Sequence, residues 1–384
     1  MRTADVVVIG GGIIGCSIAY HLLARAGRLR VVLLEREAEL GTGATARATG
    51  GIRHQFSSAT LIRLTRLSLP AFLRFEEEFG RSADFVPHGY LFVTAEPDRL
   101  EGYRRAVALQ QSLGVRSRIL APEELRDLLP QLATADLLGG SFCPDDGSAD
   151  PHGALQGFVT RARALGLEVL TRAEVVAIDR EGERVAGVRT ATERYAAPVV
   201  INAAGPFADR VAHLAGVEIP SRPYRRQVLV VEPPPELPEV FPLIVDGDSG
   251  FYVHRQGRSA LVMGGTDKDS RPGTEIAVDW EAFEPVLSAA ARRVPPLAEA
   301  KVMRAYAGLR DLTPDYHGIL GQIPEVSGFY VACGFSGHGF MHAPAIGRLM
   351  AELIVDGRAR SLDLAPLSPK RFRAGRSETE VQIF

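Results

Sequence analysis

The sequence predicts an α/β fold in which a Rossmann-like domain is interleaved with a second, α+β domain built on an antiparallel sheet. Three observations predict it. A buried strand, a glycine-rich turn and a helix open the chain within residues 5–27. A buried strand, a turn of small residues and a helix return in the same order at residues 197–216. The remaining stretches differ in character, because residues 59–130 are largely helical in pattern and residues 223–320 are strand-rich.

The opening unit rests on three short segments. DVVVIG (5–10) and VVLLE (31–35) have the continuous apolar pattern of buried strands. GGIIGCSIAYHLLARAG (11–27) predicts a turn and a helix between them, so the three segments begin a βαβ unit with a parallel sheet. The apolar stretch is nearly long enough for a membrane span, but glycines interrupt it early, and a strand, turn and helix explain it better.

Loops and shorter elements fill the rest of the first half. A loop rich in Gly, Thr and Arg (41–58) follows the second strand, and GYLFVTA (89–95) predicts a short strand within the helical region. A loop-like stretch (145–153) precedes a helix (154–166). Residues 173–191 predict a hairpin that turns at Glu181 and Gly182.

The chain is therefore expected to pass back and forth between two domains. GFYVACGF (328–335) predicts one more buried strand, and a helix-like run (345–357) follows the glycine-rich loop GFSGHGFMHAP (334–344). The expected division is listed by residue range: 1–85, 145–222 and 321–384 for the Rossmann-like domain, and 86–144 and 223–320 for the antiparallel-sheet domain.

Composition narrows the class of protein. The 384 residues leave room for two domains, and 46% hydrophobic and 23% charged residues with a mean hydropathy of +0.03 are ordinary for a globular protein. A net charge of −2 argues against nucleic acid or an anionic membrane as the main partner. Cys16, Cys143 and Cys333 are scattered without a CxxC pair, so we expect neither a disulfide scaffold nor a zinc ribbon. No signal peptide precedes the first strand, and a cytoplasmic location is expected.

The first turn carries a nucleotide-binding pattern. Gly10, Gly12 and Gly15 form G-x-G-x-x-G between a strand and a helix, and Glu35 ends the second strand, where a carboxylate can bond a ribose hydroxyl. This pattern fits NAD or FAD. The alternative is a glycine turn that binds no nucleotide. The histidines show no HExxH or similar spacing, so no catalytic metal is expected.

Three further segments carry a likeness to a known family. The segments are ELGTGATARATGGIR (39–53), VVINAAGPFADRVAHLAG (199–216), and AGLRDLTPDYHGILG (307–321) together with residues 328–344. In this order they resemble segments of the D-amino-acid-oxidase-like flavoproteins, also called the glutathione-reductase-2 type. The likeness is nearest to the sarcosine oxidase, glycine oxidase and proline dehydrogenase β-subunit branches. It implies an FAD-binding domain of Rossmann type and FAD as the cofactor.

The resemblance also assigns residues to the cofactor. Arg47 is placed near the pyrophosphate, and residues 49–51 and the 334–344 loop are placed against the flavin ring. Gly308 stands where monomeric sarcosine oxidase has a cysteine bound to the flavin, so the FAD is expected to be noncovalent. The implied cofactor residues are Gly10, Gly12, Ile13, Ile14, Gly15, Glu35, Arg36, Thr45, Ala46, Arg47, Thr49, Gly50, Gly51, Glu174, Val175, Ala203, Ala204, Gly205, Gly308, Arg310, Gly334, Ser336, Gly337, His338, Gly339, Phe340 and Met341.

Five residues are expected to act on the substrate. Arg53 aligns with the arginine that holds the substrate carboxylate in sarcosine oxidase, and Arg310 with that of glycine oxidase. The alternative for Arg53 is a phosphate contact or a structural ion pair. Tyr252 and His254 share one face of a strand and are placed over the flavin, with a structural role as the alternative for each. Met341 stands where monomeric sarcosine oxidase has a lysine, which favours a bulkier or cyclic substrate such as proline over sarcosine.

The expected reaction is oxidation of a C–N bond. A hydride equivalent passes from the carbon beside the amine of a small amino acid or secondary amine to the flavin, and water hydrolyses the imine. The oxygen-activating lysine of monomeric sarcosine oxidase corresponds to Val262, with Lys268 the nearest lysine, so oxygen and a partner or carrier both remain as acceptors. The alternatives are a β-type subunit of a heteromeric enzyme, or a non-catalytic flavoprotein that acts as an assembly factor. A homo- or hetero-oligomer is possible in each case.

Overall fold

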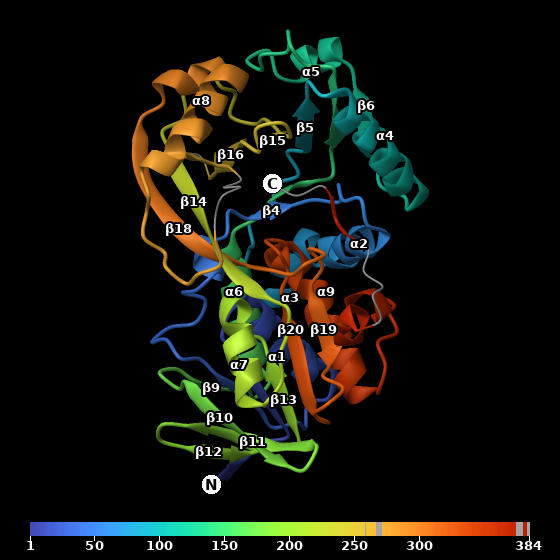
Figure 1. The fold of residues 1–384 in the computed structure, drawn as a ribbon, viewed down its shortest axis with the longest axis vertical. Coiled ribbons are helices and arrows are strands. Elements are labelled where there is room, and N and C mark those ends of the chain that lie inside the picture. Colours follow the sequence, from blue (N-terminus) through green and yellow to red (C-terminus); the bar gives the residue numbers. More distant parts are fainter. Residues whose placement is uncertain (258, 266–270, 374–378, 382–384) are drawn as a thin grey trace.

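The computed structural model describes residues 1–257, 259–265, 271–373 and 379–381. Its lower part in Figure 1 is built on a six-stranded sheet in the order β19-β20-β13-β2-β3-β9. All neighbouring strands are parallel except β19 and β20, which pair antiparallel. The strands are β2 (Val6–Ile9), β3 (Val31–Leu34), β9 (Glu168–Leu170), β13 (Val199–Asn202), β19 (Ile319–Gln322) and β20 (Phe329–Cys333).

Both faces of this sheet are covered, which is why its strands are apolar throughout. Successive side chains of β2 point to opposite faces. Val6 and Val8 pack with helices α1, α2, α6 and α9 on one face, and Val7 and Ile9 pack with a small sheet and α7 on the other. The covering elements are α1 (Ile13–Arg25), α2 (Ala59–Leu73), α3 (Phe75–Phe79), α6 (Pro151–Ala164), α7 (Ala208–Leu214), α9 (Gly339–Val355), β1 (Arg2–Thr3), β10 (Val175–Glu181), β11 (Arg184–Thr190) and β12 (Arg194–Ala196).

The upper part contains an eight-stranded sheet in the order β18-β14-β17-β16-β15-β5-β7-β6. All pairs are antiparallel except β15 with β5, so the expected antiparallel sheet contains one parallel pair. The elements are β5 (Tyr90–Thr94), β6 (Arg118–Leu120), β7 (Gly139–Cys143), β14 (Arg222–Val231), β15 (Leu243–Asp246), β16 (Tyr252–Gln256), β17 (Ala260–Gly264), β18 (Val302–Leu312), α4 (Pro97–Ser112), α5 (Pro122–Leu128) and α8 (Glu284–Arg293).

The two faces of the upper sheet have different roles. Leu91 and Val93 of β5 pack into a core with residues of α5 and α8. Tyr90 and Phe92 point the other way and cluster with Tyr252 of β16. This second face is turned toward the lower part of the molecule, and β14 and β18 extend down toward it (Figure 1).

The two parts are interleaved, as the sequence predicts. The upper sheet takes its strands from residues 90–143 and 222–312, and the lower sheet takes its strands from the segments before, between and after. A two-stranded sheet, β4 (Gly51–Ile52) with β8 (Gly147–Ser148), joins segments near the junction. The exact domain boundaries stay a prediction. In the part of the chain that the structure describes, no helix is long and apolar enough to cross a membrane.

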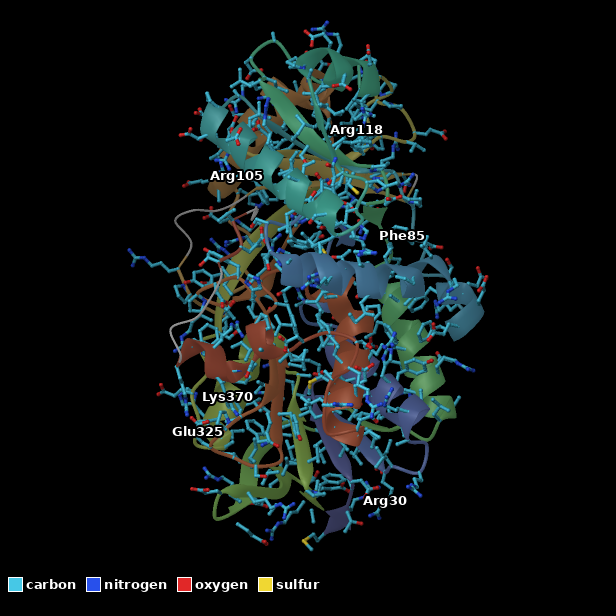
Figure 2. The ribbon with its side chains drawn as sticks, turned by 90° about the vertical axis from the view of Figure 1, so that its right-hand side faces the viewer. Arg30, Phe85, Arg105, Arg118, Glu325 and Lys370 are labelled. Carbon is cyan, nitrogen blue, oxygen red and sulfur yellow. The ribbon has the colours of Figure 1, made fainter. Side chains whose placement is uncertain are left out.

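The start of the last helix differs from the expectation. The sequence predicts a helix over 345–357, after Pro344, but α9 begins at Gly339 and contains that proline. Proline removes one backbone donor from a helix interior. The extra turns are nevertheless buried against α1 and α2, and the Ser68 hydroxyl accepts the next backbone N–H, that of Ala345, at 3.1 Å. Figure 2 shows α2 lying across the end of α9.

Candidate active site

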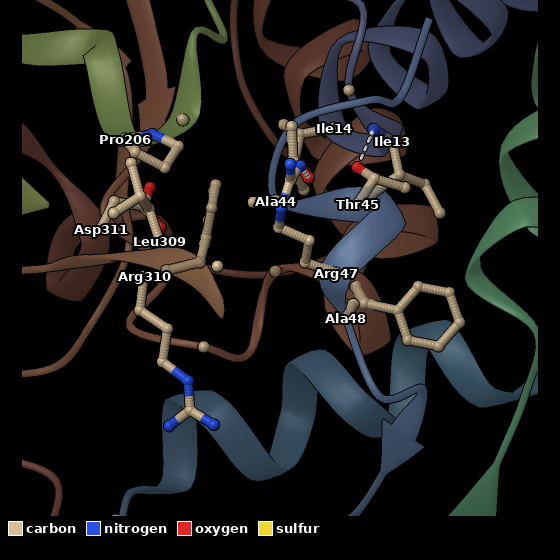
Figure 3. A pocket seen from close by; sticks show the side chains of 18 of the residues that line it. Ile13, Ile14, Ala44, Thr45, Arg47, Ala48, Pro206, Leu309, Arg310 and Asp311 are labelled. Atoms are coloured by element: carbon tan, nitrogen blue, oxygen red, sulfur yellow. Dashed lines mark hydrogen bonds between the residues drawn. The ribbon is translucent and has the colours of Figure 1, made fainter. Parts of the chain in front are cut away.

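A cavity of about 600 Å³ lies between the two sheets. The turn after β2, the loop of residues 35–53, the turn after β13, the end of β18 and the start of α9 all contribute to its wall (Figure 3). A second cavity of about 380 Å³ adjoins it, because both are lined by Gly10, Glu35, Arg36, Ala204 and Phe207. The two cavities therefore meet at the first glycine turn and at the residues that follow β3.

The three motif glycines have different roles in that turn. Gly10 has φ of +109°, and a Cβ there would lie 2.5 Å from the Ala203 carbonyl oxygen. A Cβ on Gly15 would lie 2.0 Å from the Gly10 carbonyl oxygen, so this glycine lets helix and strand pack closely. A Cβ on Gly12 would meet only the Thr45 hydroxyl, at 3.4 Å. Gly12 lines the cavity and keeps it open for a close approach to the backbone.

The first turn of α1 points its backbone donors at this cavity. Gly12 is the N-cap residue and offers no side chain to cap the helix. The Ile13 N–H donates to the Thr45 hydroxyl at 3.1 Å (Figure 3). The positive end of a helix with exposed N–H groups is a ready site for an anion such as a pyrophosphate.

Glu35 is fixed at the junction of the two cavities. Its carboxylate accepts the Gly11 N–H at 2.7 Å and the Glu37 N–H at 2.9 Å. Beside it, the Arg36 guanidinium lies 3.8 Å from the centre of the Phe207 ring. Glu174 and Val175 line the second cavity. An acidic group, a stacked arginine and an apolar wall suit the ribose and adenine of a dinucleotide.

Most of the residues implied for the cofactor come together. Of the 27, 21 line the main cavity and two more, Glu174 and Val175, line the second. The other four, Gly15, Ala46, Gly334 and Ser336, line neither. Gly334 and Ser336 shape the loop instead, because the Gly334 N–H donates to the Asp311 carboxylate at 2.6 Å and Ser336 has φ of +53°.

Arg47 and Gly308 fit against each other. The Arg47 guanidinium donates to the carbonyl oxygens of Thr42 and Gly43, within its own loop. A Cβ on Gly308 would lie 2.8 Å from the Arg47 Cβ, so only glycine leaves this side chain its place. Residue 308 therefore offers no side chain that could bond to a flavin.

Arg53 lies at the base of the cavity and is 1% exposed. Its guanidinium donates to the Gln55 carbonyl oxygen and toward His338 Nε2, which is 3.4 Å away. The guanidinium carbon is 4.0 Å from the centre of the Phe56 ring. Burial lowers the pKa of Arg53, and the negative charges of Glu380 and Asp146 act against that shift.

Three of the other four predicted substrate residues reach the same cavity. Arg310, on β18, extends into it in Figure 3, and Tyr252 and Met341 also line it. His254 does not line it, although it shares a sheet face with Tyr252. It is fully buried two residues further along β16, and its Nδ1 lies 2.8 Å from the Arg255 carbonyl oxygen. Burial lowers the pKa of His254 to about 3, so it is a neutral core residue here.

Sequence reasoning missed other residues of the wall, and Tyr90 and Asp311 are two of them. Tyr90 lies in a segment predicted only as a strand, and its pairing with β15 and β7 decides which side of that strand faces the cavity. Asp311 follows Arg310 and lines the cavity too. Burial raises the pKa of Asp311 to about 6 against the backbone N–H groups that hold the carboxylate.

One group of metal-ligand type lies next to this site. His54, Cys143 and Asp146 bring three such atoms within 4.8 Å of one another among the residues described. His54 Nδ1 and Asp146 Oδ1 are 2.7 Å apart in a hydrogen bond, and burial raises the pKa of the Cys143 thiol. A structural zinc site takes four ligands, with cysteine as thiolate. The hydrogen bonds account for these three side chains.

Comparison with known proteins agrees with this geometry. The family profile described as FAD dependent oxidoreductase (DAO) matches residues 5–353. The chain is 34% identical over 373 residues to the mitochondrial sarcosine dehydrogenase of Homo sapiens, covering 93% of this chain and 40% of that protein. It thus spans well under half the length of that relative.

Two solved structures are similar to this chain over nearly its whole length and over nearly the whole of their own chains. L-proline dehydrogenase from P. horikoshii is 30% identical with a TM-score of 0.92, and the match covers 98% of this chain and 100% of that one. Glycine oxidase from Geobacillus kaustophilus is 26% identical with a TM-score of 0.86, covering 97% and 99%. The glycine turn, Glu35 and the paired cavities fit FAD, and the chain belongs to the DAO family of FAD-dependent oxidoreductases.

Proposed function

We propose that this protein oxidises the C–N bond of a small amino acid or secondary amine, of the sarcosine, glycine or proline type, to an imine. The observation that carries the proposal is that two arginines, Arg53 and Arg310, line one cavity together with Tyr90, Tyr252 and Met341. Such a cavity offers cations for a carboxylate and an apolar wall for the rest of a small substrate. The names of the relatives, which include sarcosine and L-proline dehydrogenases and a glycine oxidase, support this substrate class.

The cofactor is assigned to the paired cavities. The N-terminus of α1 and Thr45 would hold the pyrophosphate, Glu35 would bond the ribose, and Val175 with the Arg36–Phe207 pair would hold the adenine. The start of α9, with Gly337 and Gly339, would hold the flavin ring. The bound flavin supplies the two-electron acceptor that the side chains lack.

Arg53 is assigned as the main anchor of the substrate carboxylate. A guanidinium offers a planar pair of donors, and a hydrogen bond to a charged group contributes about 1.5–3 kcal/mol. Arg310, on β18, is assigned as the second anchor. Holding the carboxylate in place orients the carbon beside the amine, and orientation itself lowers the barrier. No side-chain base is needed when the amine binds deprotonated.

Met341 narrows the substrate class. It is buried at the start of α9 and brings no charge to the cavity wall. An apolar wall at this point favours a larger or cyclic amino acid such as proline over sarcosine. The full-length similarity to an L-proline dehydrogenase supports the same choice.

The electron acceptor distinguishes two candidate functions, an oxidase that works alone and a catalytic subunit that needs a partner. Val262, at the position of the oxygen-activating lysine, is fully buried in β17, and Lys268 lies outside the residues that the structure describes. Oxygen and a protein partner both remain possible acceptors. The second candidate is the β-type catalytic subunit of a heteromeric sarcosine oxidase or proline dehydrogenase, which the sequence motifs resemble, and the full-length similarity to an L-proline dehydrogenase supports the latter. The paired arginines favour either enzyme over a non-catalytic assembly factor.

The cellular location of the protein is part of the proposal. All three cysteines are free and buried, which fits a reducing compartment such as the cytoplasm. A homo- or hetero-oligomer is compatible with both candidate functions.

Anaerobic mixing tests the proposal. The FAD-loaded protein is mixed with sarcosine, glycine, L-proline and D-amino acids while the flavin absorbance is followed. Bleaching with L-proline or sarcosine is expected, and bleaching by none of them would overturn the proposal. Hydrogen peroxide on admitting air identifies an oxidase working alone. Bleaching without peroxide identifies a dehydrogenase that needs a carrier or partner.

A further inference from the structure

The segment that carries Arg53 is held from far along the chain. Glu380 is 0% exposed, and its carboxylate accepts the backbone N–H groups of Ser57 and Ser58, each at 3.0 Å. It also accepts the Ser57 hydroxyl at 2.7 Å, and the Val381 N–H donates back to that hydroxyl at 3.1 Å. Ser57 and Ser58 lead into α2, whose N-cap is Ser58. A carboxylate from the C-terminal segment therefore sits at the positive end of an internal helix.

Charge explains why this carboxylate matters to Arg53. A buried charge is costly unless it is paired or hydrogen-bonded. Burial lowers the pKa of Arg53, and the negative charges of Glu380 and Asp146, both fully buried, raise it. Asp146 bonds the near end of the segment through the His54 N–H at 2.8 Å, whereas Glu380 bonds the far end. Two buried acids thus hold the two ends of the residues that present Arg53.

The same C-terminal segment is tied to the strand that carries Arg310. The Glu380 N–H donates to the Asp315 carbonyl oxygen at 3.2 Å, three residues beyond the end of β18. Asp315 forms a buried ion pair with Arg371, with 2.7 Å between Nε and Oδ2. His317 Nε2 lies 2.8 Å from the Ser58 hydroxyl, which closes the connection to the Arg53 segment.

We propose that Glu380 is a positioning residue that fixes the place of the positively charged Arg53 for a bound carboxylate. It acts through the Ser57 and Ser58 backbone and through its own charge, and it does not touch the substrate. The inference rests on the proposed function, since it takes Arg53 as the carboxylate anchor. The described residues 379–381 are then part of the substrate site, although none of them lines the cavity.

The test measures the binding of acetate and of acetamide through the change in absorbance of the bound flavin. Acetate carries the negative charge that Arg53 is proposed to bind, and acetamide has the same shape without that charge. Glu380→Ala is expected to raise the Kd for acetate at least tenfold and to leave the Kd for acetamide unchanged within twofold. Glu380→Gln keeps one acceptor oxygen for the serine N–H groups, so it protects the fold, and its acetate Kd is expected to rise less.

Glu352→Gln is the matched control. Glu352 is also a buried carboxylate held by backbone N–H groups, those of Arg360 and Ser361, but it lies at the far end of α9. Its replacement is expected to cost stability and to leave both Kd values unchanged. Equal weakening of acetate and acetamide in the Glu380 variants, or wild-type acetate affinity in both, overturns the inference. Failure of the wild type itself to bind acetate overturns the proposed role of Arg53 instead.

Discussion

The Thr45 hydroxyl accepts the backbone N–H of Ile13 at 3.1 Å, a contact that joins the loop after β3 to the first turn of α1. Both residues line the main cavity. The Gly41 N–H supports the same junction by donating to the Gly11 carbonyl oxygen at 2.9 Å, one residue before the N-cap, and the Thr45 bond reaches the first helical residue. This bond therefore holds together two parts of the proposed FAD site that are 32 residues apart.

Thr45→Val should loosen this junction. Valine has the shape of threonine without an acceptor, so the buried Ile13 N–H loses its partner at a cost of about 1–3 kcal/mol. We expect the free energy of unfolding to fall by about that amount and the Kd for FAD to rise. Urea unfolding and fluorescence titration of the apoprotein with FAD measure the two effects. Thr192→Val, at an exposed position, is the control, and equal behaviour of the two variants would contradict the assignment.

Replacement of Gly15 and of Gly12 by alanine should have different effects on the fold and on FAD binding. Gly15→Ala puts a Cβ 2.0 Å from the Gly10 carbonyl oxygen, so α1 must shift and the fold should be lost or strongly destabilised. Gly12→Ala meets only the Thr45 hydroxyl, at 3.4 Å, so the fold should survive while FAD binding weakens at least tenfold. Thermal unfolding with and without FAD separates the two. Gly273→Ala, which has open space around its Cβ, should match the wild type in both.

The arginine anchors should be visible in steady-state kinetics. Arg53→Lys keeps the buried charge but loses the two-pronged geometry, so KM should rise by about 10- to 100-fold, the equivalent of roughly 1.5–3 kcal/mol. Arg310→Lys should act in the same direction. Arg116→Lys is the control, because Arg116 is 72% exposed and pairs with Asp145 on the surface. An unchanged KM in both cavity variants would remove the carboxylate-anchor assignment.

The pH dependence of unfolding should show how much the Glu352 carboxylate contributes to stability. Burial alone would raise its pKa, but bonds from Ser361, the Arg360 and Ser361 N–H groups and Arg348 outweigh it and lower the pKa to about 2. A carboxyl with a depressed folded pKa stabilises the protein above its ordinary pKa and loses that contribution as pH falls toward the folded value. The wild type should therefore exceed Glu352→Gln in unfolding free energy above pH 4.5, with the gap closing toward pH 2. A gap that is constant with pH would contradict this, and exposed Glu77→Gln should show none.

Local patterns explain what could be predicted. The strand–turn–helix units have continuous apolar strands and glycines fixed by backbone geometry, so β2, α1 and β13 follow from neighbouring residues alone. The glycine motif and Glu35 belong to the same local unit, and both lie where the pattern places them. Apolar periodicity could not have shown β15, because it has only four residues, all buried, and one of its two partners, β5, comes from a distant segment.

Long-range packing explains what was missed. Nothing near His254 in the sequence indicates that the cavity wall ends two residues before it, at Tyr252. The start of α9 was placed too late because Pro344 is a strong local signal, and burial against α1 and α2 overrides it. Glu380 carries no motif at all. Its contact with Ser57 joins residues 323 apart in the chain, and only the folded arrangement brings them together.

The interleaved strand order also sets the order in which this protein can be made. On the ribosome, β2, α1 and β3 emerge first, yet the place of β20 beside β13 and the cover that α9 gives α1 come from residues 329–355. Until those residues leave the exit tunnel, Ile18 and Leu22 of α1 lack one of the surfaces that bury them. The six-stranded sheet therefore cannot be completed early, and its folding and FAD uptake must wait until translation is nearly complete, whereas all strands of the eight-stranded sheet lie within residues 90–312. Such long-exposed apolar surface makes the nascent chain a client for chaperones.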